Sequence, residues 1–357
     1  MIIVRFTSGL GNQMFQYSFY RFLKTLYKDT EVKADLTWFY ANNDHHGYEL
    51  QRIFGSNPYS PFEVEEATKR EIFRVTGVIP NLFKPRSMIT GGNIRSALDS
   101  GSLSFEPGSG VGSGRYSDFT SRAFEKIRRY PNRVIREFTR KKREPYIIDQ
   151  LGGQINNEDN YDGSNDLYDK VTSLDVSKDW YIIGFWIEEK YLNGRLDEMR
   201  QHFRFPAITD EINGKLEKEI TSSNSVSLHI RRGDYISETY EDMFEALGRD
   251  YYEGAVNYIK ERVEDPKFFI FSDDSDFVRR EFEWLDNKQI VTGNDGDLSF
   301  RDMQLMSMCK HNIIANSTFS QWAALLNDKE GHMTLYPSTY LKDSENEMKY
   351  FDGWIMI

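Results

Sequence analysis

The sequence is poor in cysteine, in long apolar runs and in net positive charge. Its 357 residues include one cysteine, Cys309, so no disulfide can form within the chain. No window approaches the about 20 apolar residues that a membrane-spanning helix needs. The net charge of −11 disfavours a general nucleic-acid-binding role, because an acidic surface repels a phosphate backbone.

The first twenty residues, MIIVRFTSGLGNQMFQYSFY, lack the features of a secretion signal. They begin with a strand-like run, without a charged start, an apolar core or a small-residue cleavage site. We therefore expect a cytoplasmic protein. One basic stretch, 128–143, begins with Arg128 and ends with Arg143. It is either a solvated helix face or a contact with anionic lipid, which would hold the protein peripherally at the inner membrane.

Hydrophobic periodicity predicts alternating strands and helices near both ends of the chain. A strand over 2–6, a glycine-containing turn, a helix over 13–27 and a strand over 31–36 form an α/β beginning. From residue 180 the alternation resumes and predicts a parallel sheet with helices on both faces. The expected strands are 180–185, 226–230, 267–272, 289–292 and 312–315, and the expected helices are 192–203, 251–263, 275–284, 300–309 and 319–326.

Length and alternation together predict two α/β domains with a cleft between them. We place an N-terminal domain at 1–205, with a variable insertion at 56–179, and a C-terminal domain at 206–357. Within the insertion, residues 100–116 and 152–166 are rich in glycine or polar residues, and the first of them reads as a flexible loop or lid.

Three polar clusters follow three of the expected strands. The first, residues 229–235 (HIRRGDY), offers two adjacent arginines. Guanidinium groups grip phosphate oxygens in a bidentate manner, and Asp234 could orient one of them. A surface salt bridge is the competing interpretation. Because ligands of open α/β sheets bind beyond the carboxyl ends of the strands, the placement favours a phosphate site.

The second cluster is Asp273 and Asp274, which follow the expected strand 267–272. One of these acids fits a helix cap, and the other leaves room for a ligand such as a nucleobase edge. The third cluster, residues 316–320 (NSTFS), precedes the last expected helix. Small hydroxyl groups at a helix N-terminus cap the helix and can also bind an anion. The three clusters together predict a pocket for a nucleoside diphosphate.

Several motifs resemble those of the α1,2-fucosyltransferases, glycosyltransferase family 11. Residues 8–17 (SGLGNQMFQY) resemble the N-terminal signature, which usually reads GGLGNQ, so Ser8 is a departure. Residues 229–235 resemble the HxRRGDY motif of the family. Residues 316–322 (NSTFSQW) resemble its NSTFSWW, with Gln321 in place of a tryptophan. The resemblance covers residues 1 to about 55 and 180 to about 327.

This resemblance implies a GT-B-like fold, with two Rossmann-like domains facing across a cleft, of which 1–205 lies on the acceptor side and 206–357 binds the donor. It also implies GDP-fucose as the donor, inversion at the anomeric carbon, and neither a metal ion nor a cofactor. Arg231 would bind the pyrophosphate, with help from Arg232. By similarity to the α1,6 enzymes, His229 and Asp273 would contact guanine. The remaining residues implied by the resemblance are Ser317, Thr318, Phe319 and Ser320 on the phosphate and fucose side, and Gly9, Gly11, Asn12 and Gln13 across the cleft, near the phosphates or the acceptor.

The expected reaction is attack by an acceptor hydroxyl on the fucose while Arg231 stabilises the charge that develops on GDP. Asp234 and Glu238 are candidates for the base, and Asp44, His45 and His46 are weaker ones. The family expectation for the acceptor is the 2-hydroxyl of a terminal galactose, on an oligosaccharide or a lipid-linked glycan.

Four rival functions stay open or are disfavoured by sequence patterns. A non-catalytic nucleotide-sugar- or glycan-binding protein would keep the same pocket, and a fucosyltransferase of another linkage would keep the same donor site. The DxD strings at 274–276 and 295–297 suit a metal-dependent transferase, but such strings recur by chance in a chain with 56 acidic residues. A nicotinamide enzyme would need the third glycine that residues 9–14 (GLGNQM) lack.

Overall fold

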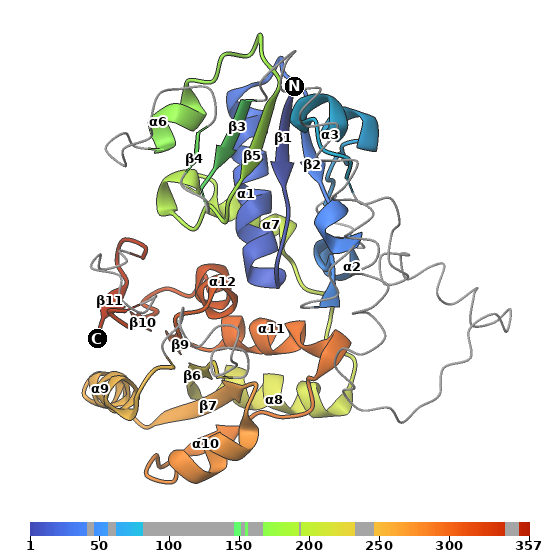
Figure 1. The fold of residues 1–357 in the computed structure, drawn as a ribbon. Helices are drawn as coiled ribbons and strands as arrows, with labels where there is room; N and C mark the ends of the chain where they lie inside the picture. The colour runs from blue at the N-terminus through green and yellow to red at the C-terminus, as the bar shows by residue number, and fades with distance from the viewer. Residues whose placement is uncertain are drawn as a thin grey trace, which may run out of the picture. The chain divides into compact units, whose positions relative to one another are not determined.

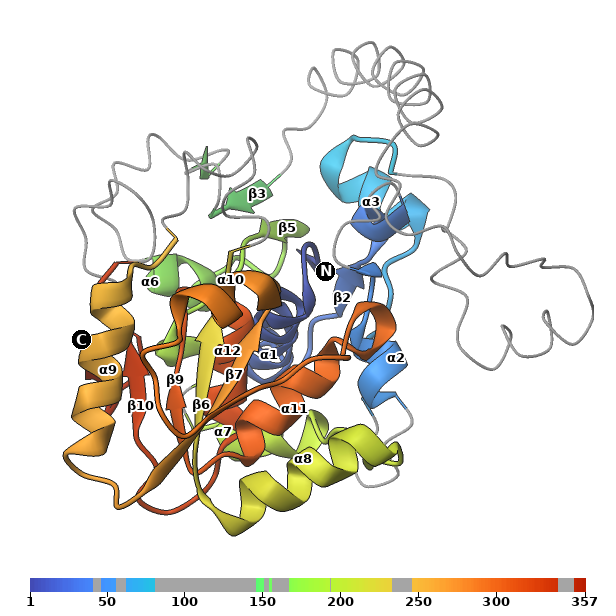
Figure 2. The same cartoon turned by 90° about the horizontal axis from the view of Figure 1, so that it is seen from below.

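The structure is a computed structural model that describes residues 1–40, 46–55, 62–80, 146–150, 154–155, 167–192, 194–232, 246–339 and 350–357. Within these residues the chain divides into two compact units. The first ends at Trp186 and the second begins at Ile187. The sequence suggested a boundary between residues 205 and 206. In the structure the boundary falls earlier, and the segment 187–205 belongs to the second unit. Figures 1 and 2 show both units as sheets flanked by helices, which confirms the predicted α/β class.

The first unit is built on a five-stranded sheet in the order β2-β1-β5-β3-β4. Strands β2, β1, β5 and β3 run parallel, and β4 is antiparallel to β3. Its elements are β1 Ile2–Arg5, α1 Leu10–Leu26, β2 Val32–Asp35, η1 Thr37–Tyr40, α2 Leu50–Phe54, α3 Lys69–Thr76, β3 Tyr146–Asp149, β4 Gln154–Ile155, α6 Leu167–Thr172 and β5 Trp180–Ile183.

Helix α1 forms the core of this unit with β1. Gly9 caps its N-terminus in an extended conformation, and the preceding Ser8 has φ 69°, a left-handed value that a glycine adopts more easily. The strain at Ser8 is offset locally, because its hydroxyl accepts a 2.9 Å hydrogen bond from the Asn12 side chain. Almost every residue from Leu10 to Tyr20 is buried, so the helix is covered on most of its circumference.

The second unit contains a six-stranded sheet in the order β11-β10-β9-β6-β7-β8, and every pair of neighbours is parallel. Its elements are η4 Glu189–Tyr191, α7 Leu196–His202, α8 Glu211–Ser222, β6 Asn224–Ile230, α9 Arg249–Lys260, β7 Pro266–Ser272, α10 Ser275–Glu281, β8 Lys288–Ile290, η5 Gly296–Leu298, α11 Phe300–Met308, β9 His311–Ile313, α12 Thr318–Leu326, β10 Thr334–Tyr336 and β11 Ile355–Met356.

The two faces of the central strand β6 differ in chemistry. Val226, Leu228 and Ile230 belong to a hydrophobic cluster with side chains of α9 and α10. Successive side chains of a strand point to opposite faces, so Ser227 and His229 face the other way. That second face is covered by α8 and α11, and α11 packs in turn against α12 (Figure 1).

The predicted elements of this unit are present with boundaries that shift by a few residues. The strand expected over 226–230 begins at Asn224, and the helix expected over 251–263 is α9, Arg249–Lys260. The helix expected over 192–203 is α7, Leu196–His202, and the short helix η4, Glu189–Tyr191, precedes it. The possible lid at 100–116 and the basic stretch 128–143 lie outside the described residues.

Candidate functional site

The sheet order of the second unit brings the three polar clusters to one edge. β6 lies between β9 and β7, and all three strands run parallel, so their carboxyl ends lie side by side. Ile230 at the end of β6 is in register with Ser272 at the end of β7. Arg231 and Asp273 therefore follow directly from paired positions. The sequence could predict the strands, but only their order in the sheet makes these clusters neighbours.

Two carboxylates hold the two arginines. Arg231 Nη1 lies 3.0 Å from Asp273 Oδ2, and the Arg232 backbone N–H donates a 2.9 Å hydrogen bond to Asp273 Oδ1. Both side chains of the Arg231–Asp273 pair keep about a quarter of their surface exposed, at 28% and 25%. An exposed fraction of this size leaves the guanidinium accessible to a ligand anion. Asp273 thus does what Asp234 was expected to do, and Asp234 lies outside the described residues.

The Arg232 side chain packs against α10. Its guanidinium carbon lies 3.7 Å from the centroid of the Phe277 ring, on α10, and its Nε lies 3.7 Å from Asp274 Oδ2. Asp274 also caps α10, because its Oδ1 accepts a 2.9 Å hydrogen bond from Phe277 N. One acid therefore caps a helix, as expected, whereas the other, Asp273, is engaged by both arginines and its role toward a ligand stays a prediction. The stacking on Phe277 left no signal that sequence reasoning could have used.

His229 is a buried, neutral histidine beneath the arginines. Its residue surface is 5% exposed, and burial together with the neighbouring Arg231 lowers its pKa to about 3. The ring lies 5.9 Å from the Phe319 ring, centroid to centroid. Among the described residues, His229 Nδ1 has no hydrogen-bond partner. A neutral imidazole with one unpaired nitrogen can donate one hydrogen bond to a ligand or accept one from it, depending on its tautomer.

The N-terminus of α12 adds hydroxyl groups at the same edge. Ser317 caps the helix, and its Oγ accepts a 3.4 Å hydrogen bond from Phe319 N. Ser320 is fully buried, and its hydroxyl bonds to the backbone of Ala315 and Ser317. Ser320 therefore shapes the turn. Ser317 and Thr318 lie nearer the surface, each 8% exposed, where the helix N-terminus favours an anion.

Two further candidates of the arginine motif cannot be placed. Asp234 and Glu238, the expected bases, lie outside the described residues, as do Asp44 and His45. His46 is described and exposed, with φ 65°. The identity of the base therefore stays a prediction.

The candidate residues of the first unit surround the N-terminus of α1. Gly9 and Gly11 form the start of the helix, and Asn12 bonds to Ser8. Gln13 is fully buried, and its amide is used within the unit. Its Nε2 donates 2.8 Å bonds to Ser8 O and to Gly47 O, while its Oε1 accepts a 2.9 Å bond from Glu49 N. Its observed role is to fix the turn, and a ligand role stays a prediction.

Gln16 has a related role that the sequence did not reveal. Its Oε1 accepts a 2.9 Å bond from Thr7 N, and its Nε2 donates to Thr7 Oγ1 and to Gly184 O. It therefore ties the residues beyond the carboxyl ends of β1 and β5 together. Its position one turn after Asn12 and Gln13 is the only signal that the sequence carries for it.

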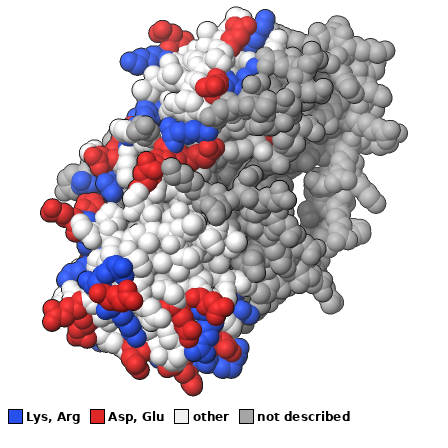
Figure 3. Space-filling model, turned by 90° about the vertical axis from the view of Figure 1, so that its left-hand side faces the viewer, with Lys and Arg blue, Asp and Glu red and all other residues white. Residues whose placement is uncertain are grey.

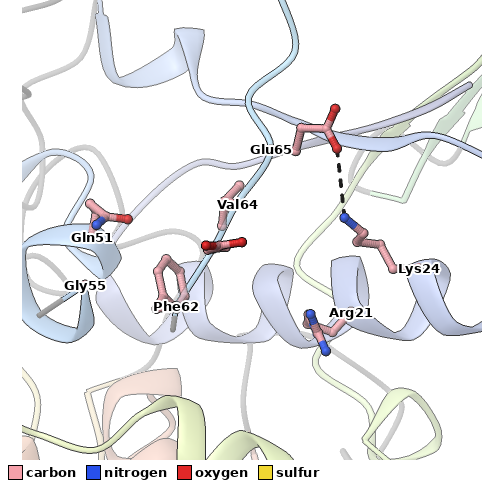
Figure 4. A pocket seen from close by; sticks show the side chains of 8 residues that line it. Arg21, Lys24, Gln51, Gly55, Phe62, Val64 and Glu65 are labelled. Carbon is pink, nitrogen blue, oxygen red and sulfur yellow. Dashed lines mark ion pairs between the residues drawn. The ribbon is translucent and has the colours of Figure 1, made fainter. Parts of the chain in front are cut away.

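A hollow of about 580 Å³ lies between α1, α2 and the segment 62–65 (Figure 4). Arg21 and Lys24 of α1 line it together with Phe62 and Glu65, and Lys24 Nζ lies 3.9 Å from a carboxylate oxygen of Glu65. Its lining carries charges of both signs, Arg21 and Lys24 against Glu63 and Glu65. They select no particular ligand.

The remaining surface and membrane features concern only the described part of the chain. There, no group of three or more histidine, cysteine and acidic side chains could hold a metal ion. No described helix is both long and apolar enough to cross a bilayer. The face in Figure 3 carries basic and acidic side chains intermingled, so its described residues form no continuous basic patch.

The arginine-bearing end of the parallel sheet suits an anionic ligand, and comparison with known proteins shows to which family the chain belongs. The model of glycosyl transferase family 11 matches residues 135–357, which is more than half of the chain. The chain belongs to glycosyl transferase family 11. The match includes both the arginine motif and the α12 motif. The N-terminal signature at residues 8–17 lies outside the matched range.

Three relatives illustrate what the chain is similar to. It is 38% identical over 135 residues to the O-antigen biosynthesis glycosyltransferase WbnK of Escherichia coli, which covers 38% of this chain and 45% of the relative. It is 32% identical over 203 residues to an alpha-1,2-colitosyltransferase of Escherichia coli, and this match covers 54% of this chain and 68% of the relative. It is 28% identical over 138 residues to a galactoside alpha-(1,2)-fucosyltransferase 1 of Aotus azarae, and this match covers 37% of this chain and 38% of the relative.

For two of these relatives the match therefore spans less than half of the relative's own length. Among solved structures, the chain is similar to the fucosyltransferase NodZ from Bradyrhizobium, with 14% identity and a TM-score of 0.41 over 91% of this chain and 92% of the other.

Proposed function

We propose that this family 11 glycosyltransferase transfers L-fucose from GDP-fucose to a glycan acceptor, with inversion and without a metal ion. The favoured acceptor group is the 2-hydroxyl of a terminal galactose, on an oligosaccharide or a lipid-linked glycan. One observation carries the donor half of this proposal. Arg231, Arg232, neutral His229 and the N-terminus of α12 meet at the carboxyl ends of three adjacent parallel strands.

The cationic part of the site suits a diphosphate leaving group. Departure of GDP places negative charge on the phosphates, and a pre-oriented guanidinium stabilises that charge without reorganising during the reaction. Asp273 provides the orientation, because it contacts Arg231 through one oxygen and the Arg232 backbone through the other. Arg231 would therefore be a catalytic residue and Asp273 a positioning residue. The role of Asp273 in guanine binding, which the resemblance implies, would use the lone pairs that these contacts leave over.

The neutral part of the site suits the nucleobase. His229 cannot carry a charge near pH 7, because burial and Arg231 lower its pKa to about 3. It would therefore add no charge that competes with the arginines for phosphate. Its unpaired Nδ1 and the adjacent Phe319 ring offer one hydrogen bond and one stacking surface, which is what a planar base requires.

A related donor is a second candidate. The relative with the broadest coverage among the three, 68% of its length, is an alpha-1,2-colitosyltransferase. Colitose differs from fucose at C3, where fucose carries a hydroxyl group and colitose a hydrogen. GDP-colitose would fit the same arginines and the same base site, so the two donors must be separated by experiment.

The test is an incubation with GDP-fucose plus lactose or N-acetyllactosamine in excess EDTA, with GDP release as the readout. We expect acceptor-dependent release that survives EDTA and collapses in Arg231→Ala. Arg279→Ala is the matched control, because Arg279 forms an exposed ion pair with Asp276 in the same unit, at 2.7 Å. It should leave the rate unchanged.

Other outcomes would refute distinct parts of the proposal. Loss of release in EDTA would overturn metal independence. Turnover with GDP-colitose and none with GDP-fucose would replace the donor. Binding of GDP-fucose without turnover on any galactoside would favour another linkage or a non-catalytic binding protein, and the absence of binding would refute the donor assignment altogether.

A further inference from the structure

Gln321 is a buried glutamine in the first turns of α12 whose side chain the protein leaves without a partner. Its residue surface is 0% exposed. Among the described residues, neither its Nε2 nor its Oε1 has a hydrogen-bond partner. By contrast, the buried amides of Gln13 and Gln16 each make three hydrogen bonds. Buried polar atoms are nearly always paired, so this exception calls for a partner outside the protein.

The position of Gln321 in α12 leans its side chain toward the start of the helix. Its backbone N–H donates a 3.1 Å bond to Ser317 O, which places it one turn after the capping residue. Residues four apart lie on the same helix face, and Cα–Cβ bonds tilt toward the helix N-terminus. The long side chain therefore reaches back toward Ser317 and Thr318, the two site residues at the start of α12.

The chemistry of the amide selects among the parts of a nucleotide sugar. A phosphate oxygen could accept from Nε2 but would offer Oε1 no donor. A sugar hydroxyl both donates and accepts, so one or two ring hydroxyls can satisfy both ends of the amide. A guanine edge could also satisfy both ends, but Phe319 and the unpaired His229 Nδ1 lie together, and two residues apart on a helix, Phe319 and Gln321 do not face the same way.

We propose that Gln321 is a specificity-determining residue that hydrogen-bonds a ring hydroxyl of the donor sugar. This inference rests on the proposed function, because it takes the donor to be a GDP-linked deoxyhexose. In the unliganded protein the unpaired amide is a source of instability, and sugar binding removes it. A donor analogue that lacks the hydroxyl leaves the amide buried and unpaired, and the site therefore rejects it.

The experiment measures the Kd values of GDP, of GDP-fucose and of GDP-fucose analogues lacking the 2-, 3- or 4-hydroxyl. The proteins are the full chain and its Gln321→Leu variant, with Gln321→Met as a second variant of similar length. We expect both variants to bind GDP within about twofold of the unsubstituted protein. GDP-fucose affinity should fall about 10- to 100-fold. For one deoxy analogue, variant and unsubstituted protein should bind equally.

A stability measurement keeps the result interpretable. Replacing an unpaired buried amide by an apolar side chain of similar size should leave the melting temperature unchanged or raise it. Equal GDP-fucose affinity in the unsubstituted protein and both variants would overturn the inference and leave the proposed function standing. An equal loss of GDP and GDP-fucose affinity would assign Gln321 to the nucleotide instead. Failure of the unsubstituted protein to bind any of these compounds would overturn the proposed function itself.

Discussion

The ion pair between Arg231 and Asp273 can be tested by a double-mutant cycle. Arg231 Nη1 lies 3.0 Å from Asp273 Oδ2, and the two side chains are about a quarter exposed. Unit charges at 4 Å attract by about 4 kcal/mol at an effective dielectric constant of 20, and partial exposure reduces this, so we expect a coupling of ~1 to 2 kcal/mol. Asp273→Asn keeps an oxygen for the Arg232 N–H and removes the charge that orients Arg231.

The readout of the cycle is kcat/KM for GDP-fucose with a saturating acceptor. Loss of a transition-state charge contact costs about 3 kcal/mol, so Arg231→Ala should lower kcat/KM by about 10²- to 10³-fold. Asp273→Asn should lower it by about 10-fold, the equivalent of ~1.4 kcal/mol. The double variant should be no worse than Arg231→Ala, because Asp273 acts through Arg231.

Additive losses in the double variant would refute this reasoning, because they would show that Asp273 acts independently, for example on guanine. The exposed pair of Arg279 and Asp276, at 2.7 Å, provides the control, since surface ion pairs contribute little. Arg279→Ala and Asp276→Asn should each leave kcat/KM within about twofold.

Three further predictions concern stability, each measured by urea unfolding. The pKa of His229 is about 3 in the folded protein and near 6.5 in the unfolded chain, so the free energy of unfolding falls as the pH drops below 6.5. In His229→Gln the fall in this free energy between pH 7 and pH 5 should be smaller by ~2 kcal/mol. Burial raises the pKa of Asp302 to about 7, so this carboxyl group lowers the free energy of unfolding as the pH rises from about 4 to 7. In Asp302→Asn the decrease between pH 5 and pH 7 should be smaller by ~2 kcal/mol. Unchanged pH profiles in these variants would contradict both. Gln13→Leu leaves Ser8 O, Gly47 O and Glu49 N unpaired in a buried turn and should destabilise the protein by ~3 kcal/mol or more, whereas a loss below ~1 kcal/mol would refute its structural role.

The location of the candidate site could be predicted because it depends on local sequence. Two arginines after an apolar run, and small hydroxyls before an apolar helix, mark a strand end and a helix start whatever surrounds them. The family was identified from the same segments and is confirmed. The roles of Asp234 and Glu238 as bases stay predictions, as do metal independence and membrane contact by residues 128–143.

The contacts within the site could not be predicted, because they join residues that are distant in the chain. Asp273 lies 42 positions after Arg231 and meets it only because β6 and β7 are neighbours in register. The stacking of Arg232 on Phe277 depends on which face of the sheet α10 covers. Likewise, the sequence marked Gln13 as a site residue, and only the fold shows its amide bonded to Gly47 and Glu49.

The sequence by itself determined the first elements of the chain, most elements between residues 180 and 326, the α/β class and the residues that lie at strand ends, because propensity, periodicity and capping act over a few neighbouring residues. The tertiary structure decided which side chains are paired and which are left for a ligand. His229 and Gln321 became candidates for ligand contact through burial without a partner, and burial is a property of the whole fold. A single chain segment cannot encode it, since the atoms that bury a group come from elements far away in the sequence.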